Sequence, residues 1–101
     1  KISKKNLLGI FIKDFNKALK DYEKFYKKNE YSQNIKQVLI EMIFQLGIDR
    51  QREFIKMNGY LEKKQLFMAS LEMKNSLWYK QTPKRVDGLI AFLLRWGHDK
   101  R

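Results

Sequence analysis

The stretch SQNIKQVLIEMIFQLG, residues 32–47, decides the fold of this chain. One side of it is apolar at steps of three and four residues, through Ile35, Val38, Leu39, Met42 and Ile43. Ile40 and Phe44 make the opposite side apolar as well. A helix that is apolar nearly all round is typical of the centre of a helical domain. We therefore predict a buried central helix over Gln33–Leu46, capped by Ser32 and ended by Gly47.

A second helical pattern precedes this stretch. Apolar residues recur at helical spacing at Leu7, Leu8, Phe11, Phe15, Leu19 and Tyr22. The opposite face is charged, with Lys13, Asp14, Lys17, Lys20 and Asp21. We predict a long amphipathic helix within residues 1–25, with Ser3 as its N-cap, that fades where residues 22–28 become dense in charge.

Shorter patterns follow Gly47. We predict one helix over residues 50–57, which Tyr60 and Leu61 extend or follow, and another over residues 66–73. Asn58-Gly59 is locally typical of a hairpin turn, although neither flank alternates as a strand would. Residues 75–81 are predicted as an aromatic-bearing turn. The last helix is predicted from Pro83 to Trp96, with Thr82 as its N-cap. Its inward side and end residue are expected to be Val86, Leu89, Ile90, Leu93 and Gly97.

Composition agrees with an all-α fold. The 101 residues fit one domain, and 44% of them are hydrophobic, which is enough for a core. One proline and five glycines leave little material for the turns of an all-β fold. The sequence therefore predicts a single helical domain over residues 1–101, a compact multi-helix bundle of six to eight helices. Its parts are a long helix over residues 1–25 and a helical lobe over residues 32–101.

The charge of the chain limits its partners. Lysine and arginine number 22 against 11 acids, a net charge of +11 that attracts polyanions. Lys84, Arg85 and Arg95 of the last helix form no basic stripe, so we expect no nucleic-acid partner. The longest apolar run, residues 38–46, is far shorter than the roughly 20 residues that cross a bilayer. We therefore expect no membrane partner.

No complete catalytic centre is visible in the residues. Cysteine is absent, no zinc-ligand spacing or phosphate loop is present, and the single histidine, His98, has no partner for catalysis. We expect His98 to be an exposed tail residue, and we expect no metal, no cofactor and no catalytic residue in this chain. Glu41 is the one carboxylate within the apolar central helix, where a buried acid must be paired or neutralised.

Two segments carry a resemblance to a known family. MIFQLG, residues 42–47, and SLWYKQTPKR, residues 76–85, together resemble the C-terminal lobe of the phage-type lysozymes, the family of the T-even bacteriophage lysozyme. The resemblance extends weakly back to residues 2–4, which look like the start of that family's long inter-lobe helix. It implies that Asn58-Gly59 lies inside a short helix rather than in a hairpin, at a propensity cost of about 1 kcal/mol for the glycine.

The resemblance implies a function and a set of site residues. The family cuts peptidoglycan glycan strands with a glutamate, an aspartate and a threonine that precede the inter-lobe helix, so those positions have no counterpart here. The residues that carry over belong to the substrate-binding wall and are Gln45, Gly47, Phe54, Trp78 and Arg85. Ordinary core packing is the alternative role of Phe54 and Trp78.

Two features depart from the family pattern. Arg85 resembles an arginine that pairs with the catalytic glutamate of the family, and we hypothesise that Glu41 pairs with Arg85 instead in this chain. After Gly47, the basic segment of residues 48–52 replaces a small glycine-bearing turn, so the shape of the wall is open to change.

We therefore hypothesise that the chain is the C-terminal lobe of a bacteriophage lysozyme, or endolysin, that degrades the cell wall. The first residue is Lys1 and not methionine, so we expect the sequence to begin inside a longer precursor or at a cleavage boundary. The chain alone is then expected to be inactive, with its catalytic lobe outside it. The alternative is a non-catalytic lysozyme-derived module that binds a protein or cell-wall partner, as in a virion assembly. The resemblance implies synthesis in the cytoplasm of a host bacterium and action on the wall in the periplasm or from a virion.

Overall fold

The structure of the chain is a computed structural model that describes the backbone of residues 4–97 and the side chains of residues 15–97. The predicted cap at Ser3, the tail residue His98 and the predicted apolar contacts of Leu7, Leu8 and Phe11 lie outside these residues.

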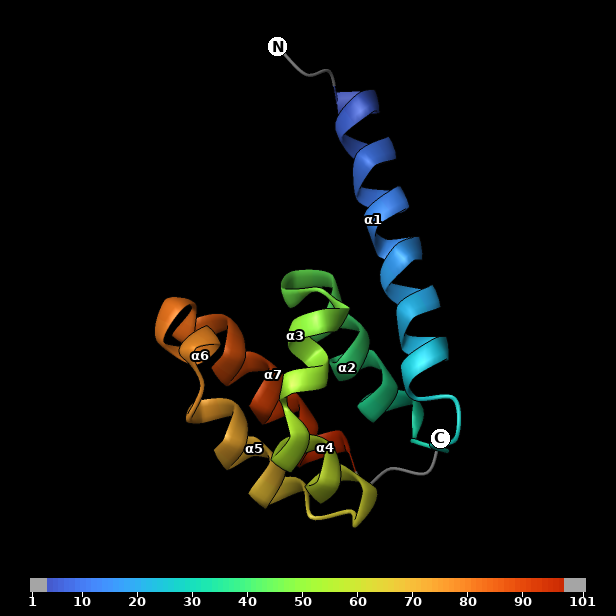
Figure 1. Ribbon diagram of the computed structural model, residues 1–101. Helices are drawn as coiled ribbons and strands as arrows, with labels where there is room; N and C mark the ends of the chain where they lie inside the picture. Colours follow the sequence, from blue (N-terminus) through green and yellow to red (C-terminus); the bar gives the residue numbers. More distant parts are fainter. Residues whose placement is uncertain (1–3, 98–101) are drawn as a thin grey trace.

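Residues 4–97 form seven helices and no strand, which confirms the all-α prediction. The helices are α1 (Lys4–Phe25), α2 (Gln33–Leu46), α3 (Ile48–Glu53), α4 (Ile55–Glu62), α5 (Leu66–Lys74), α6 (Leu77–Gln81) and α7 (Pro83–Trp96). Figure 1 shows α2 to α7 gathered into one lobe, from which the N-terminal half of α1 extends outward. The predicted bounds of the helices now called α2 and α7 are confirmed.

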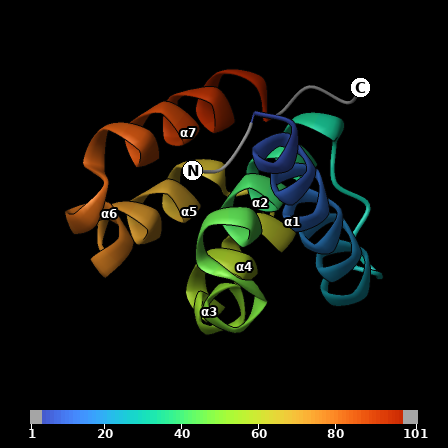
Figure 2. The ribbon, with the colours of Figure 1, turned by 90° about the horizontal axis from the view of Figure 1, so that it is seen from above.

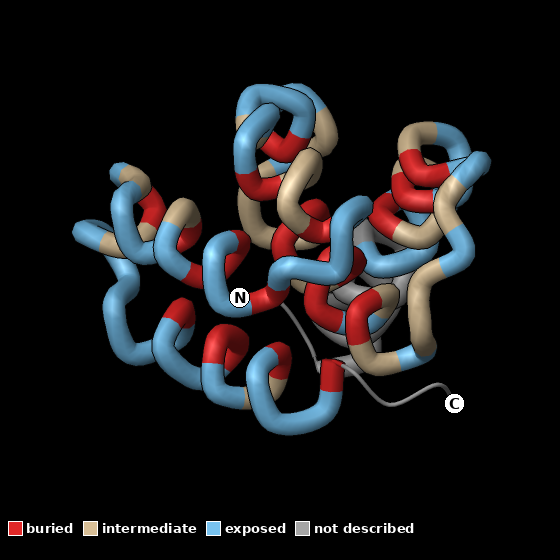
Figure 3. The backbone as a smooth tube through the Cα atoms, turned by 90° about the horizontal axis from the view of Figure 1, so that it is seen from below, coloured by how far each residue is buried: buried red, intermediate tan, exposed pale blue. Residues whose placement is uncertain are grey.

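The central helix is α2, as predicted. It packs against α1, α3 and α7, and six of its side chains are buried, including the fully buried Met42. Figure 2, seen from above, shows α2 between α1 and the pair formed by α5 and α7. Buried positions lie on the inward sides of the helices, and exposed positions lie on their outer sides (Figure 3). The Ser32 hydroxyl accepts the Ile35 N–H, which confirms its capping role.

Three local predictions need correction. The single helix predicted over residues 50–57 is divided into α3 and α4 at Phe54, whose ψ of 57° lies outside the helical region. The predicted turn at residues 75–81 contains the short helix α6, because the Ser76 hydroxyl caps it by accepting the Tyr79 N–H. Thr82 precedes α7 without capping it, since its hydroxyl donates to the Trp78 carbonyl instead.

The Asn58-Gly59 pair lies inside α4, as the family resemblance implied. Tertiary hydrogen bonds explain why the turn-forming pair stays helical. The Asn58 side-chain oxygen accepts from the Tyr26 hydroxyl at 2.6 Å, and its amide donates to the Gln51 carbonyl at 3.3 Å. These bonds tie α4 to the residue that follows α1 and to α3.

Gln51 completes a buried polar cluster beneath α2 that the sequence did not reveal. Its side chain is fully buried, and its amide donates to the Tyr26 hydroxyl at 3.0 Å. Burial raises the pKa of Tyr26 well above its ordinary value, against its side-chain hydrogen bonds with Gln51 and Asn58, which lower that pKa. The cluster Tyr26–Gln51–Asn58 therefore fixes the short helices α3 and α4, one wall of the candidate site, against the core.

Candidate functional site

The first pair of predicted site residues comes together directly. The Trp78 indole N–H donates to the side-chain oxygen of Gln45 at 3.1 Å. Trp78 lies on α6 and is buried, whereas Gln45 lies in the last turn of α2 and is half-buried. Because the indole N–H can only donate, this bond fixes the Gln45 carbonyl toward Trp78 and turns its amide NH2 away from the tryptophan.

Phe54 joins this pair at the junction of α3 and α4. Its ring meets the Trp78 ring edge to face, with centroids 6.4 Å apart. The non-helical backbone of Phe54 sets the angle between α3 and α4 and so places the Phe54 ring. Gln45, Phe54 and Trp78 thus form one contiguous unit, here called the Gln45–Trp78 wall. The core-packing alternative applies to part of it, since Trp78 is only 5% exposed.

Two surface hollows meet at this wall. The first, of about 640 Å³, is lined by Phe54 and Trp78 together with charged side chains from α3, α4 and α5: Arg50, Glu53, Lys56 and Glu72. The second, of about 530 Å³, lies between α1, α2 and α7 and is lined by Gln45, Glu41 and Arg85 among apolar side chains. The Gln45–Trp78 hydrogen bond therefore joins the linings of the two hollows.

Glu41 and Arg85 line the second hollow together. Glu41 is half-buried and Arg85 is exposed, so neither charge is removed from water as the sequence suggested for Glu41. Among the side chains of residues 15–97, the ion pair within 4 Å is Lys36–Glu23, and no such contact joins Glu41 to Arg85. Their pairing stays a prediction, and an exposed guanidinium needs no buried partner.

Gly47 ends α2 beside Gln45, with φ +85° and ψ 155°. This conformation is open to glycine and strained for other residues, which explains the glycine at this position. The basic segment after it, residues 48–52, does not form a loop but the helix α3. Arg50 and Arg52 are exposed on that helix, and Arg50 faces the first hollow.

The groups that the structure brings together at the wall are suited to binding a polar ligand. No group of three or more His, Asp or Glu side chains within residues 15–97 is arranged to hold a metal ion. No helix in the described part of the chain is both long and apolar enough to cross a bilayer. The wall offers an amide donor and two aromatic rings, with charged side chains of both signs around it, a set of groups that suits a polar ligand with hydroxyl and carbonyl groups.

Comparisons with known proteins point to a lysozyme relationship. No family model matches the chain. It is 38% identical over 63 residues to the Probable T4-type lysozyme 2 of Dictyostelium discoideum. The matched residues are 62% of this chain and 37% of that protein. It is 32% identical over 89 residues to the Probable T4-type lysozyme 1 of the same organism. This match covers 84% of this chain and 52% of that protein. The chain therefore spans about half the length or less of these relatives, and its similarity at modest identity supports a relationship to T4-type lysozymes.

Proposed function

We propose that the chain is the C-terminal helical lobe of a T4-type muramidase and supplies the wall against which peptidoglycan glycan strands bind. The observation that carries this proposal is the Gln45–Trp78 wall, in which three residues from α2, α6 and the α3–α4 junction form one unit between two hollows. The similarity to proteins named T4-type lysozymes supports it.

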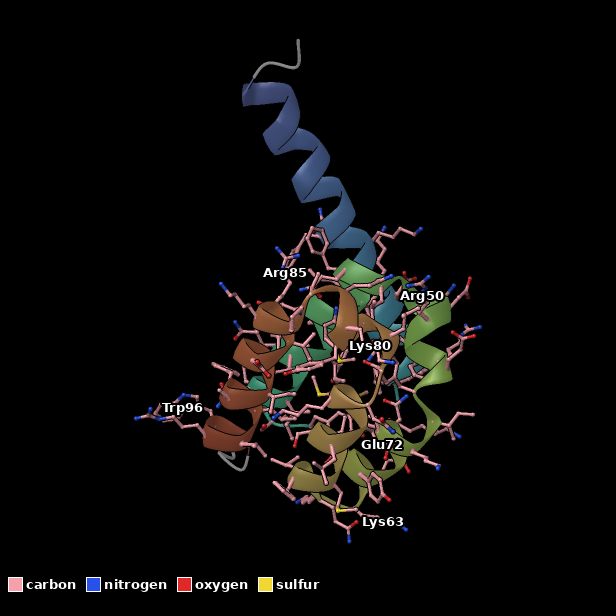
Figure 4. The ribbon with its side chains drawn as sticks, turned by 90° about the vertical axis from the view of Figure 1, so that its left-hand side faces the viewer. Arg50, Lys63, Glu72, Lys80, Arg85 and Trp96 are labelled. Atoms are coloured by element: carbon pink, nitrogen blue, oxygen red, sulfur yellow. The ribbon has the colours of Figure 1, made fainter. Side chains whose placement is uncertain are left out.

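The wall has the chemistry that an amino sugar strand requires. With its carbonyl held by Trp78, Gln45 offers its amide N–H groups to hydroxyl and N-acetyl carbonyl oxygens. Gly47 has no side chain, so the backbone two residues after Gln45 is uncovered. Arg50, Lys80 and Arg85 project from α3, α6 and α7 in the upper half of the lobe in Figure 4. These cations and the net charge of +11 favour association with an anionic wall polymer.

Cleavage would need groups from outside this chain. In the complete enzyme a glutamate would act as general acid and a second carboxylate or an activated water would complete the displacement. Arg85, which is exposed and lines the second hollow, is available to pair with such a carboxylate. We therefore expect the chain alone to bind sacculi without clearing them.

Binding to purified sacculi tests this function. Gln45→Ala should weaken binding by roughly 3- to 10-fold, the loss of about one or two hydrogen bonds to a neutral ligand. Gln65→Ala is the matched control, since Gln65 is an exposed glutamine at the start of α5, away from the wall. Equal binding of the two variants would contradict a role of the Gln45–Trp78 wall in binding sacculi. Clearing of sacculi by the chain alone would contradict the incomplete catalytic centre.

The second candidate is a non-catalytic module that binds a protein or cell-wall partner, for example within a virion assembly. The observation that favours it is α3, whose exposed Arg50 presents charge beside the wall, while its exposed Arg52 lies over the Phe25 ring of α1. The residues encoded upstream of Lys1 discriminate between the two: a Glu, Asp and Thr pattern supports the enzyme, and unrelated sequence supports the module. Bacteriophage origin, synthesis in a host bacterium and action on the wall in the periplasm or from a virion remain part of the proposed muramidase function. The two relatives named above come from Dictyostelium discoideum.

A further inference from the structure

Helix α5 leaves an apolar side uncovered. Its inner side is buried through Leu66, Ala69, Ser70 and Met73. Its outer side is also apolar, and Phe67 is 63% exposed, Leu71 41% and Met68 39%. Adjacent exposed apolar side chains of this size on one short helix are unusual on a monomer and mark an interaction surface.

The last helix continues this surface. α5 packs against α7. Leu66 at the start of α5 lies beside Gly97, which follows α7: a Cβ added to Gly97 would lie 2.6 Å from the Cδ1 atom of Leu66. The two helices therefore run side by side in opposite directions, as Figure 4 shows from this side of the molecule.

Helical periodicity identifies which side chains flank the seam between the two helices. One flank of α5 faces the first hollow through Glu72, and one flank of α7 faces the second hollow through Phe92. Leu71 on α5 and Leu94 on α7 lie on the other flanks, toward the seam. Leu94 is 38% exposed. We call Phe67, Met68, Leu71 and Leu94 the apolar α5–α7 face.

The face is bordered mainly by cations. Lys63 and Lys64 precede α5, Lys74 ends it, and Arg95 follows Leu94 on α7; all four are exposed. The acids nearby are fewer. Glu62 ends α4, Asp87 accepts from the Tyr79 hydroxyl at 3.3 Å, and Glu72 lines the first hollow instead.

Charge and shape together select the occupant. A second copy would bring another chain of +11 and another lysine border against this one, which opposes self-association. Nucleic acid or an acidic polysaccharide would satisfy the lysines but leave Phe67 and Leu71 in water. None of the four apolar side chains lines either hollow, so neither hollow gives this face a groove for a peptide.

We propose that the apolar α5–α7 face docks on an anionic lipid surface. Phe67, Met68, Leu71 and Leu94 enter the boundary between headgroups and acyl chains, and Lys63, Lys64, Lys74 and Arg95 contact acidic headgroups. The sequence expectation of no membrane partner rested on the length of apolar runs, which concerns spanning and not lying on the surface. The proposal does not depend on sugar binding, since the Gln45–Trp78 wall uses none of these residues.

Vesicle cosedimentation tests the apolar part. The chain should bind vesicles of mixed phosphatidylglycerol and phosphatidylcholine and should not bind phosphatidylcholine alone. Phe67→Ser with Leu71→Ser should weaken binding to the anionic vesicles by roughly 10-fold or more. Ile55→Ser with Leu77→Ser removes two side chains that are 76% and 62% exposed outside the face, and should leave binding unchanged. Far-UV circular dichroism checks that both variants stay folded.

Matched charge variants test the cationic border. Lys63→Gln with Lys74→Gln should weaken binding by roughly 10-fold. Lys27→Gln with Lys28→Gln lowers the net charge equally but lies in the segment joining α1 to α2, on the opposite side of the lobe from α5 in Figures 1 and 2, and should have a smaller effect. Because the chain has no cysteine, Leu71→Cys carries a polarity-sensitive dye at one site, and its emission should shift to the blue on anionic vesicles.

Several results would overturn the proposal. Equal binding of the serine variants of the face and of the control would show that charge alone attracts the chain to lipid. Absence of binding to anionic vesicles, or equal binding to neutral ones, would reject the lipid surface. A concentration-dependent dimer in analytical ultracentrifugation that Phe67→Ser with Leu71→Ser dissociates would assign the face to a second copy instead.

Discussion

Helices α2 and α5 carry the same sequence signal and have different surroundings. Both are apolar round most of their circumference. α2 has α1, α3 and α7 packed around it, which bury six of its side chains. α5 is covered by α4 and α7 on its inner side, and Phe67 and Leu71 remain exposed. An all-round apolar pattern therefore predicts a helix but does not distinguish a core element from an interaction surface.

The largest expected effect uses one substitution on both helices. Met42→Ala on α2, where the side chain is fully buried, should lower the free energy of unfolding by about 2–5 kcal/mol through lost burial and the cavity left behind. Met68→Ala on α5, where the side chain is 39% exposed, should lower it by only about 0.5 kcal/mol. Urea denaturation measures both. Similar losses at the two positions would contradict the contrast between the helices.

The end of α2 gives a second matched pair. Gly47→Ala should cost about 1–3 kcal/mol, because alanine is strained at φ +85° although no neighbour lies within 4 Å of its Cβ. Gly59→Ala, inside α4 and also without a close neighbour, should stabilise the chain by up to about 1 kcal/mol. A neutral Gly47→Ala variant in the same denaturation experiment would show that α2 ends differently.

The polar cluster beneath α2 should matter at neutral pH. Tyr26→Phe removes the hydroxyl that donates to Asn58 and accepts from Gln51, which leaves polar groups without partners in the core. The free energy of unfolding should fall by about 1–3 kcal/mol. No loss at pH 7 would mean that water replaces the hydroxyl.

Two buried tyrosines, Tyr22 and Tyr26, predict that stability falls at alkaline pH. Burial, with a smaller contribution from Glu23, raises the pKa of Tyr22 from 10.0 to about 12, and burial raises that of Tyr26 further. The folded chain thus favours the neutral phenol, so this stability is fully present below pH 10 and is lost as pH rises through 10 toward the folded pKa values. Thermal unfolding between pH 8 and pH 12 should show the fall, and Tyr26→Phe should make it less steep.

Helix α6 extends the comparison to a helix too short to form alone. Ser76→Ala removes the hydroxyl that caps α6 and should cost about 1 kcal/mol. Thr82→Ala should cost less, because the Thr82 hydroxyl does not cap α7. Since α6 carries Trp78, the indole N–H signal of Trp78 should also broaden in Ser76→Ala. A larger loss for Thr82→Ala would reverse the assigned roles.

Much of the fold could be predicted from periodicity and caps. The bounds of α2 and α7, the cap at Ser32 and the positive φ of Gly47 follow from local rules that the chain obeys. The break at Phe54 and the helix α6 could not be predicted in this way, because short helices depend on tertiary packing and single capping bonds. Asn58 remains helical for the same reason, through bonds to Tyr26 and Gln51, which are distant in sequence.

The candidate site was only partly predictable. The family resemblance named Gln45, Phe54 and Trp78, and the structure brings them into contact. Gln51 was missed because a buried glutamine looks like a surface residue in sequence, and only its place between two helices gives it partners. The exposure of Phe67 and Leu71 could not be predicted, because their four-residue spacing also occurs on the core side of a helix.

Titration with soluble glycan fragments, followed by NMR, tests the central claim most directly. The chain has two tryptophans, so its spectrum contains two indole N–H signals. Trp78 is buried and bonded to Gln45, whereas Trp96 is 44% exposed at the end of α7. We predict that peptidoglycan glycan fragments shift the Trp78 signal and leave that of Trp96 in place. A saturating shift of Trp96 with an unchanged Trp78 would contradict the Gln45–Trp78 wall as the binding surface.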